Sequence, residues 1–215
     1  MIAMILAAGR GERLRPLTDN VPKSLVEVNG ESLLERHLQR LHSGGVETVV
    51  INLGWLGEQI LERVGSGERY GLNVIYSQEG DNILETGGGI HRALPVLGSE
   101  PFLVVNADIY TDMPVPDIKL GGDDLAHLVL VPVPEGKSGD FAIEEGRIRN
   151  RGGEMATFSG VSIYRPEFFA ECEAGRFSVV PMLRAAADAD QVSGSYYAGL
   201  WRDVGTPARL AELNA

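Results

Sequence analysis

The chain opens with an apolar segment, Ile2 to Ala8, that runs directly into a turn rich in glycine and arginine. This stretch, residues 7–18, reads Ala-Ala-Gly-Arg-Gly-Glu-Arg-Leu-Arg-Pro-Leu-Thr, and Lys23 follows within Pro22-Lys23-Ser24. Glycine exposes its backbone amide and tolerates positive φ, so a strand that ends in glycines suits a close approach by phosphate. The arginines and the lysine supply the positive charge that binds a polyphosphate. We therefore predict a binding site for a nucleoside triphosphate at this turn.

Two well-known phosphate-binding patterns fail here on spacing. The dinucleotide fingerprint requires a third glycine after Gly9 and Gly11, but Leu14 occupies that position, and Pro16 interrupts a helix that would begin at the turn. The Walker A loop requires Lys-Ser or Lys-Thr directly after its last glycine, whereas Lys23-Ser24 lies beyond a separate loop. A lone Gly-x-Gly is most often an ordinary turn, but the arginines, prolines and lysine around this one add further constraints.

Bulk composition excludes several kinds of partner. The chain has 215 residues, of which 44% are hydrophobic and 23% charged, as in an ordinary globular protein. No apolar run approaches the roughly 20 residues that cross a bilayer, and the start lacks the basic leader of a signal peptide. A net charge of −11 argues against binding to a nucleic-acid backbone. The single cysteine, Cys172, excludes an intrachain disulfide and fits a reducing cytoplasm. From these observations together, we expect a cytoplasmic protein without a membrane or nucleic-acid partner.

Strand-like and helix-like segments alternate in the first half of the chain, and shorter strand-like segments dominate the second half. Ser32-Leu33-Leu34-Glu35 is typical of a capping box that opens a helix, which Gly44-Gly45 ends. We expect strands at Thr48–Leu53, Val74–Tyr76, Phe102–Asn106, Leu125–Val133 and Thr157–Tyr164, and helices at Leu56–Val64, after Thr86, at Val179–Ala189 and from Thr206-Pro207 onward.

This alternation predicts an α/β fold, with a single Rossmann-like, doubly wound, mixed but mostly parallel sheet and helices on both faces. We expect one domain over residues 1–215. Its first part, to about residue 110, would bind the nucleotide. Its second part, from about residue 111, would cover the substrate end of the sheet.

Two aspartates stand at the ends of predicted strands. Asp108 follows the apolar run from Phe102 to Asn106, and Asp203 follows Leu200-Trp201. Ligands of an open parallel sheet gather beyond the carboxyl ends of its strands, and Mg²⁺ prefers carboxylate, water and phosphate oxygens. Either aspartate alone would be explained by a turn. Together with the cationic turn, they predict a magnesium site.

A second glycine cluster, Thr86-Gly87-Gly88-Gly89, falls where a helix is predicted. Three glycines inside a helix would each cost about 1 kcal/mol relative to alanine. We therefore expect a helix start at which the backbone meets a ligand closely. A flexible turn is the alternative.

The motif Gly-x-Gly-x-Arg-Leu-x-Pro-Leu-Thr, followed by Pro-Lys-Ser-Leu, is similar to the signature of sugar-1-phosphate nucleotidyltransferases. The resemblance covers essentially the whole chain. Residues 84–89 and 157–160 resemble the branch that acts on N-acetylmuramate 1-phosphate in bacterial cell-wall recycling. The resemblance implies the nucleotide-diphospho-sugar transferase fold and a Mg²⁺ held by Asp108 and Asp203. It implies Arg13 and Lys23 as catalytic residues and a nucleotide site formed by Leu6, Ala7, Ala8, Gly9, Gly11, Glu12, Arg13, Lys23, Glu85, Gly87, Gly88 and Asn106.

For the acceptor sugar, Gly139-Asp140-Phe141 matches the family segment that meets the sugar, so the resemblance implies that Asp140 binds hydroxyl groups. A solvated turn aspartate is the alternative. The chain departs from the family at two places. Ala107 stands where relatives often have glycine before the first metal aspartate, and residues 144–154 lack the Glu-Lys-Pro loop of many relatives.

The resemblance leads to the hypothesis of a uridylyltransferase that converts UTP and N-acetylmuramic acid 1-phosphate to UDP-N-acetylmuramic acid and pyrophosphate. An alternative keeps the chemistry and changes the substrates, for example guanylyl transfer to mannose 1-phosphate or cytidylyl transfer to a choline-type phosphate. A non-catalytic nucleotide-binding module is less favoured, because a sensor has little need for Arg13, Lys23, Asp108 and Asp203 together. We expect a monomer or a weak homodimer.

Overall fold

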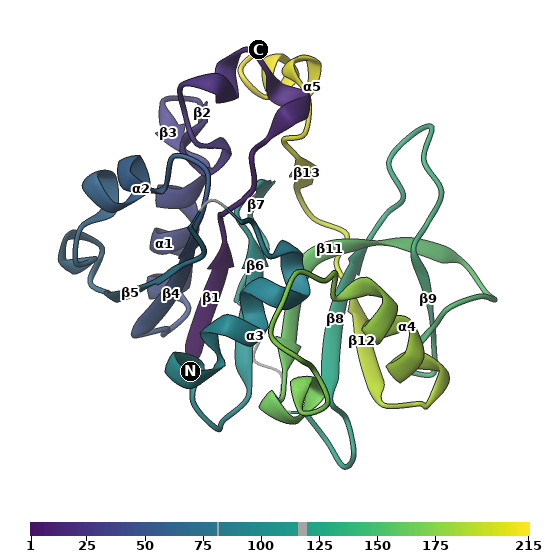
Figure 1. Ribbon diagram of the computed structural model, residues 1–215. Helices are drawn as coiled ribbons and strands as arrows, with labels where there is room; N and C mark the ends of the chain where they lie inside the picture. The colour runs from purple at the N-terminus through teal and green to yellow at the C-terminus, as the bar shows by residue number, and fades with distance from the viewer. Residues whose placement is uncertain (81, 116–119) are drawn as a thin grey trace.

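The computed structural model describes residues 1–80, 82–115 and 120–215. A nine-stranded twisted sheet crosses the molecule, with helices packed on both of its faces (Figure 1). The strands are β1 (Ile2–Leu6), β2 (Glu27–Val28), β3 (Glu31–Ser32), β4 (Thr48–Leu53), β5 (Asn73–Gln78), β6 (Phe102–Asn106), β7 (Ile109–Thr111), β8 (Ala126–Val131), β9 (Phe141–Glu144), β10 (Arg147–Arg149), β11 (Met155–Tyr164), β12 (Val192–Tyr196) and β13 (Trp201–Asp203). The helices are α1 (Leu33–Ser43), α2 (Gly57–Val64), α3 (Glu85–Leu97), α4 (Val180–Asp188) and α5 (Pro207–Leu213), with 3₁₀ turns η1 (Glu12–Leu14), η2 (Leu17–Asp19), η3 (Lys23–Leu25), η4 (Glu68–Tyr70) and η5 (Pro166–Phe169).

The strand order of the large sheet is β5-β4-β1-β6-β11-β8-β12-β10-β9. From β5 to β6 all neighbours are parallel, as expected for alternating strands and helices. Beyond β6 the pairing changes, because β11 is antiparallel to both β6 and β8, while β8 and β12 are parallel. The α/β fold and the mixed sheet are therefore present. The parallel arrangement is confined to the half built from the first 106 residues and to the β8–β12 pair.

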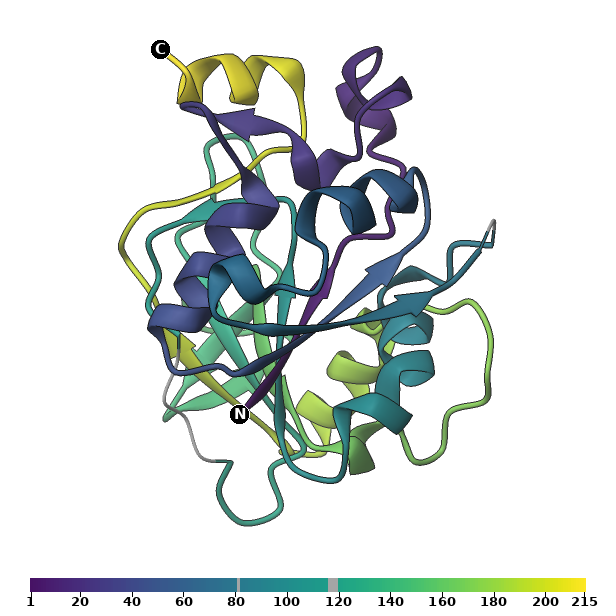
Figure 2. The same ribbon diagram turned by 90° about the vertical axis from the view of Figure 1, so that its left-hand side faces the viewer.

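Each face of the sheet has its own hydrophobic core, because successive side chains of a strand point to opposite faces. Ala3 and Ile5 of β1 pack on the side of α1 and α2, where Leu38 and Ile60 are fully buried. Met4, between them, packs on the side of α3 and α4. Figure 2 shows the helices lying on either side of the sheet. This two-sided burial explains why the strand segments read as continuous apolar runs.

Helix α1 begins where the sequence predicted. The Ser32 hydroxyl oxygen accepts a hydrogen bond from the Glu35 amide at 3.2 Å, and Gly44 follows the last helical turn. The final helix also begins at the predicted position, and the Thr206 hydroxyl oxygen caps it by accepting a hydrogen bond from the Arg209 amide at 3.4 Å. Cys172 lies outside the helices, shortly after η5, where its amide donates to the Phe169 carbonyl at 3.0 Å.

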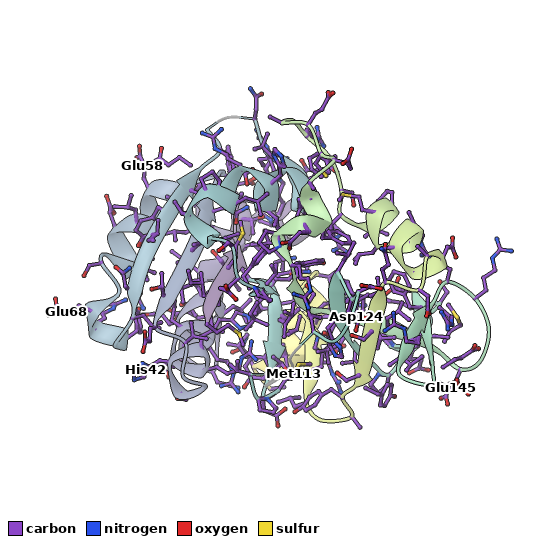
Figure 3. The ribbon with its side chains drawn as sticks, turned by 90° about the horizontal axis from the view of Figure 1, so that it is seen from below. His42, Glu58, Glu68, Met113, Asp124 and Glu145 are labelled. Atoms are coloured by element: carbon purple, nitrogen blue, oxygen red, sulfur yellow. The ribbon has the colours of Figure 1, made fainter. Side chains whose placement is uncertain are left out.

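Two small sheets lie apart from the large one. Strand β7 pairs with β13, and β2 forms a hairpin with β3 close to α5 (Figure 1). Among the described residues, no helix is long and apolar enough to cross a membrane. Acidic side chains such as Glu58, Glu68 and Glu145 are exposed and project from the edges of the molecule (Figure 3). The excess negative charge therefore includes side chains at the periphery.

Candidate active site

The glycine-arginine turn leaves the carboxyl end of β1, which lies between β4 and β6 in the sheet. Gly11 has φ of +64°, and a Cβ at this position would lie 3.0 Å from the Cβ of Lys23. The Thr18 hydroxyl donates a 2.8 Å hydrogen bond to the Gly11 carbonyl. The turn therefore folds back on itself and brings Lys23 beside the glycines, although more than ten residues separate them in the sequence.

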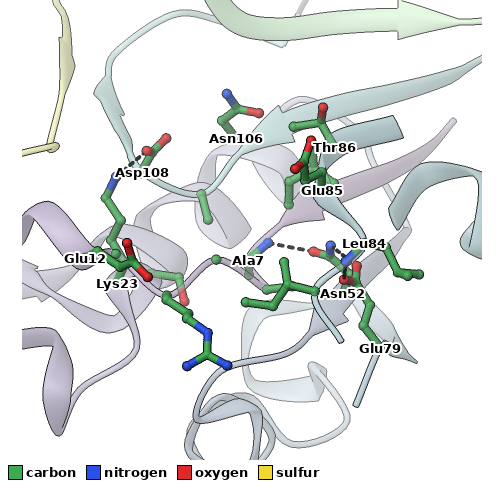
Figure 4. Close-up of a pocket in the computed structure, with 18 of the residues that line it drawn as sticks. Ala7, Glu12, Lys23, Asn52, Glu79, Leu84, Glu85, Thr86, Asn106 and Asp108 are labelled. Carbon is green, nitrogen blue, oxygen red and sulfur yellow. Dashed lines mark hydrogen bonds and ion pairs between the residues drawn. The ribbon is translucent and has the colours of Figure 1, made fainter. Parts of the chain in front are cut away.

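A cavity of about 1040 Å³ opens above this edge of the sheet (Figure 4). It combines Asn52, near the end of β4, with segments that follow β1, β5 and β6, as expected for a ligand site at the carboxyl ends of parallel strands. Its volume is at the upper end of the range of ligand pockets, about 300–1000 Å³. Of the predicted nucleotide, catalytic and metal residues, the lining includes Leu6, Ala7, Ala8, Gly9, Gly11, Glu12, Arg13, Lys23, Glu85, Asn106 and Asp108.

Both predicted metal aspartates are paired with cations. Lys23 donates to the carboxylate of Asp108 across a part-buried ion pair (Figure 4). Asp203 contacts Arg209 of α5, and the Lys137 ammonium group lies 3.5 Å from its carboxylate. The pairing of β13 with β7 brings the two aspartates into one region, because the Val204 amide donates to the Asp108 carbonyl at 2.8 Å.

Arg13 points toward the same region from the glycine-arginine turn. A Cβ on Gly205 would lie 3.2 Å from the Arg13 guanidinium and 3.1 Å from a carboxylate oxygen of Asp203. The absence of a side chain at Gly205 therefore leaves room for the side chains of Arg13 and Asp203 to lie close together. The structure therefore gathers Arg13, Lys23, Asp108 and Asp203, although Asp203 is not part of the described cavity lining.

The carboxylates of Asp108 and Asp203 could bind a metal ion whose remaining ligands come from a substrate. In the part of the chain that the structure describes, no group of three or more His, Cys, Asp or Glu side chains could hold a metal ion. Two carboxylates fit Mg²⁺ when phosphate oxygens and water complete the coordination, which is its usual mode beside nucleotides. Asp108 and Asp203 could therefore hold a divalent cation together with a triphosphate.

A chain of buried hydrogen bonds that no sequence motif indicated runs through the cavity wall. The Ala7 amide donates to the Asn52 side-chain oxygen at 2.6 Å, and the Asn52 amide group donates to Glu79 at 2.7 Å. The other Glu79 carboxylate oxygen accepts from the Leu84 amide at 2.7 Å (Figure 4). Both side chains are less than 9% exposed, and their hydrogen bonds tie the glycine-arginine turn to the start of α3. The signal was a polar residue near the carboxyl end of each strand, Asn52 in β4 and Glu79 after β5.

The second glycine cluster lies against protein rather than along the described cavity lining. The amides of Gly87 and Gly88 both donate to the Phe177 carbonyl, and a Cβ on Gly88 would lie 2.1 Å from the Gly175 carbonyl oxygen. A role for these two glycines in nucleotide binding stays a prediction. Glu85 has φ of +61° at the start of α3 and pairs at 2.9 Å with Arg176 at the cavity.

Two further predicted residues occupy defined places beside β11. The carboxylate of Asp140 accepts a 2.9 Å hydrogen bond from the Phe158 amide, which accounts for one of its oxygens and leaves its sugar contact a prediction. Gly160 has φ of +80° in a bulge of β11, and a Cβ there would lie 2.7 Å from the side chain of Asn106. The absence of a side chain at Gly160 therefore gives Asn106 room at the cavity wall.

Comparison with known proteins agrees with this geometry. A family model described as nucleotidyl transferase matches residues 2–126. The N-acetylmuramate alpha-1-phosphate uridylyltransferase of Neisseria meningitidis serogroup B is 48% identical over all of this chain and 97% of its own length. A protein of the same description from Caulobacter vibrioides is 37% identical over 98% of this chain and 97% of its own. The inositol-1-phosphate CTP transferase from T. maritima shares the fold, with a TM-score of 0.75 at 22% identity over 99% of this chain and 94% of its own. On the family model and the two near-full-length relatives, the chain belongs to the nucleotidyl transferase family.

Proposed function

We propose that this protein is a sugar-1-phosphate nucleotidyltransferase that forms UDP-N-acetylmuramic acid and pyrophosphate from UTP and N-acetylmuramic acid 1-phosphate. The observation that carries the proposal is the 48% identity with the Neisseria uridylyltransferase over the whole chain. The convergence of Arg13, Lys23, Asp108 and Asp203 at one edge of the sheet supports the same chemistry. The reaction would serve peptidoglycan recycling in the cytoplasm, with the protein acting as a monomer or a weak homodimer.

The reaction needs little covalent chemistry from the protein. An oxygen of the sugar phosphate, which is already anionic, attacks the α-phosphorus of UTP in line. The new oxygen–phosphorus bond replaces the bond from the α-phosphorus to the bridging oxygen, and pyrophosphate leaves with that electron pair. Because the nucleophile is ionised, no general base is required. Catalysis is then positioning together with stabilisation of negative charge.

Two cationic side chains at the site have a place in this scheme. Arg13 stabilises the charge that develops on the departing pyrophosphate, and Lys23 orients the phosphates for attack. Asp108 and Asp203 would hold Mg²⁺, which neutralises charge on the phosphate oxygens when bound. One-third of the Asp108 side chain is exposed, so its carboxylate is accessible from the cavity that it lines. Residues to about 110 would bind the nucleotide, and those from about 111, including Asp140, the acceptor.

A substrate panel tests the proposal. The four nucleoside triphosphates are each combined with N-acetylmuramic acid 1-phosphate, mannose 1-phosphate and phosphocholine, in the presence of Mg²⁺, and pyrophosphate release is measured. We expect the highest kcat/KM for UTP with N-acetylmuramic acid 1-phosphate. A higher value for GTP with mannose 1-phosphate, or CTP with phosphocholine, would reassign the substrates. Binding of UTP without pyrophosphate release from any pair would indicate a nucleotide-binding module instead.

A further inference from the structure

Arg10, between the two glycines of the turn, has a side chain that the proposed mechanism does not use. It lines the cavity and is exposed, and its guanidinium lies over the ring of Trp55, 5.0 Å from the ring centroid. Among the described residues, Arg10 has no carboxylate within salt-bridge distance, whereas Lys23 and Arg176 at the same cavity each do. In a chain of net charge −11, an arginine at a ligand cavity that pairs with no carboxylate of the described residues is suited to an anionic ligand.

Trp55 is held firmly against the same turn. Its backbone amide donates to the Ala8 carbonyl at 3.2 Å, and its indole N–H donates to the Thr18 carbonyl at 2.9 Å. The preceding residue, Gly54, sits so close that a Cβ would lie 2.6 Å from the Ala8 carbonyl oxygen. The indole ring is therefore a fixed platform. A guanidinium placed over an aromatic face keeps the N–H donors along its edge free for hydrogen bonds.

The sheet order indicates which part of a nucleotide Arg10 would meet. Trp55 follows β4, and Asp108 follows β6, so the two lie on opposite sides of β1. The strands assigned to the acceptor, β8 and β11, continue the sheet beyond β6. In-line attack places the leaving group opposite the nucleophile, and pyrophosphate therefore extends away from the acceptor, toward the β4 side of β1. Arg10 is the cavity cation on that side that carries an aromatic support.

We propose that Arg10 binds the β- and γ-phosphates of the nucleotide and that Trp55 orients its guanidinium for this purpose. Arg10 is thus a further binding residue, and Trp55 is a positioning residue that acts through it. The inference rests on the proposed function in one respect, namely that the ligand is a nucleoside triphosphate. It does not depend on the base or on the acceptor.

Isothermal titration in the presence of Mg²⁺ tests the role of Arg10, with UTP, UMP and inorganic triphosphate as probes and no acceptor present. For Arg10→Met we expect the Kd for UTP and for inorganic triphosphate to rise about tenfold or more, because the variant loses charge-assisted hydrogen bonds to the phosphates. The Kd for UMP should stay within about twofold. The matched control is Arg15→Met in the same turn, because Arg15 is half exposed and pairs with Asp19 at 3.0 Å. An unchanged Kd for UTP in Arg10→Met, or an equal loss for UTP and UMP, would overturn the proposal.

A second pair of variants tests the role of Trp55. Trp55→Phe retains an aromatic face and loses the indole hydrogen bond, whereas Trp55→Leu loses both. We expect Trp55→Leu to weaken UTP binding severalfold and Trp55→Phe to restore most of that affinity. The double variant Arg10→Met/Trp55→Leu should bind UTP no more weakly than Arg10→Met, because the platform acts through Arg10. Additive losses would refute the coupling. A wild-type protein that binds all four triphosphates equally would count against the uridylyl assignment and leave this comparison intact.

Discussion

Asp108 is held in an ion pair with Lys23 at the cavity, and its charge is the property that the proposed mechanism uses. Asp108→Asn keeps the size of the side chain and can still accept a hydrogen bond from Lys23, but it removes the negative charge. We expect kcat for pyrophosphate release to fall by about 10²-fold or more, as when other transition-state electrostatic partners are removed. The thermal unfolding midpoint should change little. Asp19→Asn, which alters an exposed carboxylate paired with Arg15, serves as the control and should retain activity. Near-normal turnover of Asp108→Asn would contradict a metal-binding role.

Gly88 of α3 packs so closely against the backbone of Gly175 that there is no room for a side chain. A Cβ here would lie 2.1 Å from the Gly175 carbonyl oxygen, a contact that the backbone must move to relieve. Alanine favours a helix over glycine by about 1 kcal/mol, and overpacking costs about 1–3 kcal/mol. Because the contact is with backbone, we expect a cost at the upper end, so that Gly88→Ala lowers the free energy of unfolding by about 2 kcal/mol. Urea denaturation measures this change. Gly121→Ala, where no atom of the described residues lies within 4 Å, is the control for adding a methyl group without a close contact. If the two variants have the same free energy of unfolding, residues 175–177 move aside for the added methyl group without a measurable loss of stability, and the prediction is wrong.

Among the elements, α1 is joined to α2 and η4 through the carboxylate of Glu35. This carboxylate accepts hydrogen bonds from Arg63 and Arg69 at 2.9 Å each, from Tyr70 at 2.8 Å and from the Ser32 hydroxyl at 2.7 Å. Burial raises the pKa of Glu35, but the hydrogen bonds from Arg63, Ser32 and Tyr70 outweigh it and lower the pKa from 4.5 to about 2. The ionised form is therefore favoured in the folded protein.

The depressed pKa of Glu35 predicts how stability depends on pH. Its stabilisation is fully present above the unfolded-state pKa of 4.5 and is lost as the pH falls toward about 2, because the folded protein then has to protonate a bonded carboxylate. With Arg63 and Arg69 about half exposed, we expect about 1–2 kcal/mol after screening by solvent. Urea denaturation of wild type and Glu35→Gln between pH 7 and pH 3 measures this. The difference in unfolding free energy should shrink as the pH falls, and a constant difference would contradict the prediction.

The elements that could be predicted from the sequence are those with local signals. Helix α1 has its serine cap and its following glycines, and β6 has a continuous apolar run, so both were found at nearly their observed bounds. The short strands β7, β9, β10 and β13 have no such signal, because each depends on a partner elsewhere in the chain. The same limit applies to the site. The sequence indicated that the backbone is closely approached at residues 87–89, but it did not indicate by what. Gly87 and Gly88 are approached by residues 175–177, and Gly89 is approached by the buried side chains of Asn52 and Glu79.

At the scale of the whole molecule, one sheet carries both the nucleotide cavity and the strands assigned to the acceptor. Strand β6, which leads to Asp108, pairs on one side with parallel β1 and on the other with antiparallel β11. The sequence predicted the parallel half, because helices separate its strands. The antiparallel half follows from the return of β11 beside β6, a long-range pairing that no local pattern encodes. The change of direction therefore occurs at β6, the strand that lies between the two proposed substrates.

Because the cavity lining runs from Leu6 to Gly205, a bound nucleotide should stabilise the molecule as one unit. A ligand at 100 times its Kd adds about 2.7 kcal/mol to the free energy of unfolding, which corresponds to a rise of roughly 5–10 °C in Tm for a chain of this size. We expect calorimetry with UTP and Mg²⁺ to show a single transition that moves upward by this amount. In Lys23→Met the rise at the same UTP concentration should be much smaller, since the variant loses a cation that the proposal assigns to the phosphates. Two transitions, of which UTP moves only one, would mean that residues 1–110 and 111–215 unfold separately and that the expectation of a single domain is wrong.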